Sequence, residues 1–165
     1  MNIFYLNKDP FIAARVQYNK HVVKMILESA QMLCTAHHCY GSAEQKLHVP
    51  YKQAHLNHPS TIWCRQNVKQ YYWLYNHMIA LGEEYTKRYG KEHLTITKCK
   101  EPLDLCPFGM PNGDFCEPPQ AMPDEFRSDD AVYSYREYYK SKLFNFKEPR
   151  RPQWNKLRPA PEWWA

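Results

Sequence analysis

The sequence lacks the features of membrane and secreted proteins. No apolar run is long enough to cross a bilayer. The first residues do not combine a basic segment with a long apolar segment, as a signal peptide does. The six cysteines include no C-x-x-C pair, so we expect reduced thiols inside a cell. These absences predict a cytoplasmic protein without a membrane span.

Several catalytic motifs are also missing. The chain has no G-x-G-x-x-G, no P-loop, no G-x-S-x-G and no H-E-x-x-H. These motifs support nucleotide-fuelled enzymes, serine hydrolases and zinc proteases, so the sequence favours none of those classes and we expect no cofactor.

Cysteine and histidine near residues 34–39 suggest one metal alternative. Zinc could be held by some of these side chains together with others further along the chain, but structural zinc prefers two separated ligand pairs. Cys34 and His37 also lie on an apolar helical stripe, which favours burial in the core. We therefore predict no metal site. The residues weighed were Cys34, His37, His38, Cys39, His48, His55 and Cys64.

Length and composition indicate one folded domain over residues 1–165. The chain is 44% hydrophobic and 15% aromatic, which is typical of a globular protein. Its formal net charge is +5 and its isoelectric point is about 8.8. A moderately basic chain permits nucleic-acid binding without requiring it.

The apolar pattern predicts a mainly α-helical fold of about three main helices with long irregular loops. Residues 2–7 read as a short strand or an extended arm. The predicted helices run from Pro10 to about His38, from about Ser60 to Tyr89 before Gly90, and from a cap at Ser128. Residues 99–123 read as irregular loop, and 146–165 as an extended, basic and aromatic tail.

A charged cluster on the first predicted helix is the main candidate for chemistry. His21, Lys24 and Glu28 fall within about 60–80° of one another around a helix, with Lys20 one turn before Lys24. An amine and a carboxylate held this close can transfer protons. The alternative is a solvated surface carrying an ordinary Lys–Glu pair.

Cations gather at two other places. His58 opens the second predicted helix with Arg65 two turns in, and a helix start of this kind favours anions. The alternative is that His58 only caps the helix. The last third of the chain interleaves cations with aromatic residues, which suits phosphates and unpaired bases. The alternative there is a tail packed on its own helices.

Four segments carry a family resemblance. "NIFYLN" at 2–7, the helical stretch beginning "HPSTIWCRQ" at 58–90, "MPDEFR" at 122–127 and "RPQWNK" at 151–156 occur in this order. Together they resemble the phage pyrimidine-dimer DNA glycosylases of the endonuclease V type, over most of the chain.

The resemblance implies an all-α protein that binds kinked double-stranded DNA, flips a damaged pyrimidine nucleotide, removes the base and acts as an abasic-site lyase. In that family the N-terminal α-amine attacks the sugar C1′, and a glutamate on the first long helix assists. An α-amine suits this role because its pKa is near 8. The catalytic residues this implies here are Met1 or Asn2, His21, Lys24 and Glu28. The implied DNA-binding residues are Lys20, His58, Arg65, Arg127, Arg136, Lys140 and Trp154.

Two departures leave alternatives open. Asn2 disfavours removal of the initiator methionine, so the amine would be that of Met1. The family glutamate should fall near Lys20 or His21, so Glu28 is the nearest carboxylate and His21 an alternative base. One rival is a phage enzyme that modifies a flipped pyrimidine, for example by amine transfer. Another is a non-catalytic DNA-binding or inhibitor protein. We expect a monomer, in the host cytoplasm if a phage encodes it.

Overall fold

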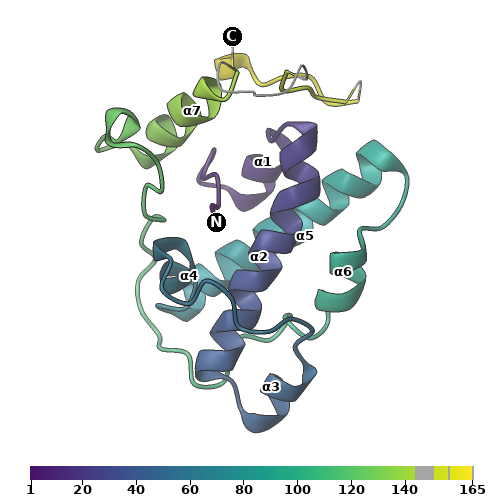
Figure 1. Ribbon diagram of the computed structural model, residues 1–165, viewed down its shortest axis with the longest axis vertical. Helices are drawn as coiled ribbons and strands as arrows, with labels where there is room; N and C mark the ends of the chain where they lie inside the picture. Colours follow the sequence, from purple (N-terminus) through teal and green to yellow (C-terminus); the bar gives the residue numbers. More distant parts are fainter. Residues whose placement is uncertain (144–150, 156, 165) are drawn as a thin grey trace.

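The computed structural model describes residues 1–143, 151–155 and 157–164, and they form a mainly helical protein (Figure 1). This confirms the predicted fold class, with three long helices and long irregular connections. Residues 2–7 form no strand, and they are not extended throughout, because Phe4 has φ +57°. The helices are α1 (Pro10–Arg15), α2 (Asn19–Tyr40), α3 (Ala43–His48), α4 (Pro59–Cys64), α5 (Val68–Tyr89), α6 (Leu94–Cys99) and α7 (Ala131–Ser141), with 3-10 turns η1 (Asp124–Phe126) and η2 (Glu162–Trp164).

The core lies where α2 packs across α5, with α1 against the same helix (Figure 1). Apolar side chains of both long helices are buried there: Val22 and Ile26 on α2 and Leu74 on α5 are all 0% exposed. Val23 and Leu27 on the same helix are also apolar, but each is 39% exposed. The buried stripe on α2 is therefore narrower than the sequence pattern suggested.

The first predicted helix is two helices, so its prediction as one element was wrong. The chain breaks between α1 and α2, where Tyr18 is extended. The guanidinium of Arg88 on α5 donates to the carbonyl oxygens of Arg15 at 3.0 Å and Gln17 at 2.8 Å. These hydrogen bonds replace the intrahelical bonds that those carbonyls would otherwise accept.

The second predicted helix is also divided, at residues 65–67. The Asn67 side chain accepts a hydrogen bond from the Gln70 backbone N–H at 3.1 Å, which starts α5 as a new helix. The predicted end of the helix at Gly90 is confirmed. Gly90 has φ +73° and its N–H donates to the Thr86 carbonyl at 2.8 Å, as in a left-handed helix end.

The last long helix begins two residues later than predicted. Asp130, not Ser128, caps α7, and its side chain accepts from the Tyr133 backbone N–H at 3.0 Å. Ser128 instead forms a local turn, in which its hydroxyl accepts from the Asp130 N–H at 3.2 Å.

The described part of the C-terminal tail packs on the helices, as the alternative for this segment predicted. The Gln153 carbonyl accepts from the Asn19 backbone N–H at 2.8 Å, and the Asn155 amide donates to the Arg88 carbonyl at 2.9 Å. Arg158 pairs with the buried Glu84 at 2.9 Å. Residues 144–150, 156 and 165, which include three tail cations, lie outside the described residues: Lys147, Arg150 and Lys156.

Within the described ranges no helix is long and apolar enough to cross a membrane. No group of three or more metal-ligating side chains lies together in the same residues. Cys34 and His37, considered above as zinc ligands, are both 0% exposed core residues, and the His37 Nε2 lies 2.8 Å from the Tyr71 hydroxyl oxygen.

We expect acid to destabilise the fold through two buried histidines. Burial lowers the pKa of His37 and of His77 to about 4 each, and both side chains are 0% exposed. As pH falls from about 6.5 towards 4, the unfolded chain binds protons that the folded chain does not, so stability is lost across this window. Urea unfolding at pH 5.0 should give a free energy lower than at pH 7.5 by about 2 kcal/mol per histidine. Equal stability at the two pH values would contradict this assignment.

Candidate functional site

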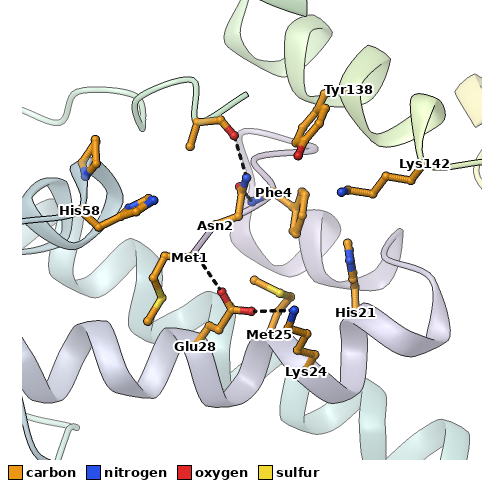
Figure 2. Close-up of a pocket in the computed structure, with 12 residues that line it drawn as sticks. Met1, Asn2, Phe4, His21, Lys24, Met25, Glu28, His58, Tyr138 and Lys142 are labelled. Carbon is orange, nitrogen blue, oxygen red and sulfur yellow. Dashed lines mark hydrogen bonds and ion pairs between the residues drawn. The ribbon is translucent and has the colours of Figure 1, made fainter. Parts of the chain in front are cut away.

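A pocket of about 420 Å³ lies where the chain start, α2, the beginning of α4 and α7 meet (Figure 2). Five of the predicted catalytic residues and one predicted DNA-binding residue line it. They are joined by residues that the sequence did not single out. The full lining is Met1, Asn2, Phe4, His21, Lys24, Met25, Glu28, His58, Pro59, Ala121, Tyr138 and Lys142.

Asn2 holds the chain start in place. Its side-chain oxygen accepts from the backbone N–H groups of Ile3 at 2.7 Å and Phe4 at 2.9 Å. Its side-chain amide donates to the Ala121 carbonyl at 2.9 Å. Phe4 has φ +57°, a left-handed conformation that is costly for a residue with a Cβ. The structure therefore places Asn2 as a positioning residue for the terminus beside it.

The terminal amine faces the acidic residue of the charged cluster. The Met1 nitrogen lies 3.4 Å from Oε1 of Glu28, and Lys24 Nζ lies 3.8 Å from the other carboxylate oxygen (Figure 2). The side chains of Met1 and Glu28 are only 1% and 14% exposed, whereas that of Lys24 is 64% exposed. The three groups predicted from sequence thus come together, with the carboxylate between two amines.

His21 is held as a neutral ring. It stacks between Phe4 and Tyr18, with centroid separations of 4.3 and 4.2 Å, and its Nε2 lies 2.8 Å from the Tyr18 hydroxyl oxygen. Burial lowers the pKa of His21 well below its usual value, and the nearby ammonium groups of Lys142 and Lys24 lower it further. His21 is therefore uncharged at neutral pH, which suits a base and does not suit a phosphate-binding cation.

His58 caps α4, which agrees with the alternative prediction that this residue serves as a helix cap. Its Nδ1 accepts from the Ser60 backbone N–H at 3.1 Å, so the proton of the neutral ring is on Nε2. Partial burial lowers the pKa of His58, and the positive charge of the chain start lowers it further. His58 thus forms a neutral wall of the pocket beside Met1.

Tyr138 and Lys142 complete the pocket from α7 and the residue that caps its end. Lys142 Nζ lies 4.6 Å from the centre of the Tyr138 ring and 5.5 Å from that of Phe4. The sequence placed Lys142 only among the cations of the last third of the chain, and it did not single out Tyr138. Their i,i+4 spacing places them on one face of a helix, but no local signal indicates that this face meets the chain start.

Three of the predicted DNA-binding residues form contacts within the fold and do not line the pocket. Arg136 Nε donates to the Leu6 carbonyl at 2.9 Å, which joins α7 to the chain start. The Trp154 indole N–H donates to the Val16 carbonyl at 3.0 Å. Lys140 Nζ pairs with a carboxylate oxygen of Glu137 at 2.5 Å.

The other three lie nearer the surface. Lys20 is exposed on α2, one turn before Lys24. Arg127 is 55% exposed, pairs with Asp124 at 3.2 Å and lines a neighbouring hollow that shares Pro59 and Ala121 with the pocket. Arg65 is half-buried at the end of α4. Of these three cations, Arg127 is the one that lines a hollow adjoining the pocket.

No family model, curated protein or solved structure matches this chain. The resemblance to pyrimidine-dimer glycosylases therefore stays a prediction.

Proposed function

We propose that this protein is a DNA glycosylase with abasic-site lyase activity, and that the α-amine of Met1 is its nucleophile. One observation carries the proposal: the Met1 amine lies 3.4 Å from the largely buried carboxylate of Glu28 inside a pocket. An α-amine becomes a nucleophile when it loses its proton, and the Glu28 carboxylate beside it can accept that proton.

The proposed reaction begins on a deoxyribose brought into the pocket by nucleotide flipping. The lone pair of the amine forms a bond to C1′, and the bond between C1′ and the base breaks, with its electron pair and a proton going to the base. The sugar ring then opens as the nitrogen loses its remaining proton to O4′, which leaves an imine. Glu28 is placed to take up and return these protons, and Lys24 holds its carboxylate beside the amine.

Covalent trapping tests the proposal. The purified protein is incubated with a duplex that contains an abasic site, together with borohydride, which reduces an imine to a stable amine. We expect the intact mass to rise by that of the DNA strand, and peptide mapping to place the adduct on Met1. An undamaged duplex should give no adduct. The mass without DNA also reads whether Met1 is the first residue of the purified protein.

The same experiment separates the two rivals. A base-modifying enzyme on this fold is favoured by the lysines that surround the pocket, because they suit an anionic leaving group. Such an enzyme would form no adduct with the abasic duplex and would change the mass of a pyrimidine base in the undamaged duplex. A binding protein would give neither product. An adduct on Lys24 or Lys142 instead of Met1 would contradict the assigned nucleophile.

A further inference from the structure

The charges that line the pocket do not balance. Three amines face it, those of Met1, Lys24 and Lys142, whereas Glu28 is the only carboxylate among the described lining residues. His21 and His58, the two histidines of the lining, are neutral, because burial and nearby positive charges lower the pKa of each. The pocket therefore carries an excess of about two positive charges when its amines are protonated.

Lys142 accounts for one of these charges. Within the described part of the chain, its ammonium has no carboxylate at ion-pair distance. It lies instead over the faces of Tyr138 and Phe4, which attract a cation without neutralising it. Lys69, which lies outside the pocket, does have a carboxylate partner: its Nζ lies 3.8 Å from Oδ1 of Asp114.

Lys24 accounts for the second charge. Glu28 is shared between the Met1 amine and Lys24, so one carboxylate faces two ammonium groups. His21, on the same helix as Lys24, is 8% exposed, and the charges of Lys142 and Lys24 both lower its pKa. Figure 2 shows the two lysine amines on the same side of the pocket as His21.

We propose that the pocket holds a phosphate group of its nucleotide substrate between Lys142 and Lys24, beside the Met1 amine. Ammonium groups are compact charges that bind phosphoryl oxygens through charge-assisted hydrogen bonds. The inference rests on the proposed function only in naming the substrate a nucleotide. The phosphate itself is inferred from the charges of the pocket. The same chemistry is offered by a backbone phosphodiester of DNA and by the phosphate monoester of a nucleotide.

Titration with inorganic phosphate, followed by NMR of the His21 ring signals, tests the site directly. We expect saturable shifts of these signals, and an affinity about tenfold weaker in Lys142→Met, because one charge-assisted contact is lost. Lys142→Arg keeps the charge and should retain most of the affinity. Lys69→Met removes a lysine outside the pocket and should bind phosphate as the unaltered protein does.

Two further probes distinguish the sources of the phosphate. Thymidine monophosphate carries a monoester, and the dinucleotide of two thymidines carries a diester. Tighter binding of either one supports the site and identifies its source. Equal affinities of Lys142→Met and Lys69→Met for all three probes would overturn the proposal. These measurements need no covalent adduct, so they are independent of the trapping experiment. Phosphate binding without a trapped adduct would reject only the amine chemistry. A trapped adduct without phosphate binding would reject only the phosphate site.

Discussion

Glu28→Gln should lower the rate of base removal and of imine formation by a factor on the order of 10² to 10⁴. An amide has nearly the shape of the carboxylate, but it cannot accept a proton from the Met1 amine or balance its charge. Glu28 is 14% exposed and its carboxylate lies 3.4 Å from that amine, so solvent does not readily replace it. Single-turnover rates on abasic-site DNA, with trapped adduct as the readout, measure the effect.

A carboxylate outside the pocket provides the matched control. Glu44 is exposed in the first turn of α3, and Glu44→Gln should leave the single-turnover rate unchanged. DNA affinity should not fall in either variant, since neither substitution removes a cation. A Glu28→Gln protein that traps abasic DNA as fast as the Glu44→Gln protein would exclude Glu28 from the chemistry.

Glu84→Gln should lower the free energy of unfolding by about 3 kcal/mol. The Glu84 carboxylate is 4% exposed and accepts from Arg88 Nε at 2.9 Å and from Arg158 Nε at 2.9 Å. The Arg88 side chain is 0% exposed, so its charge would remain buried without a carboxylate. Urea unfolding at pH 7.5 measures the loss as a lower midpoint.

The neighbouring glutamate serves as the comparison. Glu83 is exposed on the same helix, and Glu83→Gln should change the free energy of unfolding by less than about 0.5 kcal/mol. If the midpoints of the two variants coincide, the buried ion pair contributes little to stability. Loss of the tail contact through Arg158 alone can be separated with Arg158→Met, which leaves Arg88 and Glu84 paired.

The sequence predicted the features that depend on spacing along one helix. The buried stripe of α2 follows from the positions of Val22 and Ile26, and the end of α5 follows from Gly90. The Lys24–Glu28 pair also lies within one helix, at i,i+4, and the structure has it. Such features need only the geometry of a helix, so they can be derived before the fold is known.

Features that depend on distant parts of the chain could not be derived in this way. The break between α1 and α2 depends on Arg88, which lies 73 residues after Arg15. Lys142 reaches the pocket because α7 packs near the chain start, where Arg136 donates to the Leu6 carbonyl. No periodicity near residue 142 carries that information.

The place of the first residue has a practical consequence for producing the protein. The Met1 side chain is 1% exposed and its nitrogen faces Glu28, so a purification tag fused before Met1 would turn this amine into an uncharged amide. A formyl group left on the methionine in a bacterial expression host would do the same. On the proposed mechanism, a preparation altered in this way would lack the nucleophile and would be inert. Material for assay should therefore carry its tag elsewhere, or be released by a protease that leaves Met1 as the first residue.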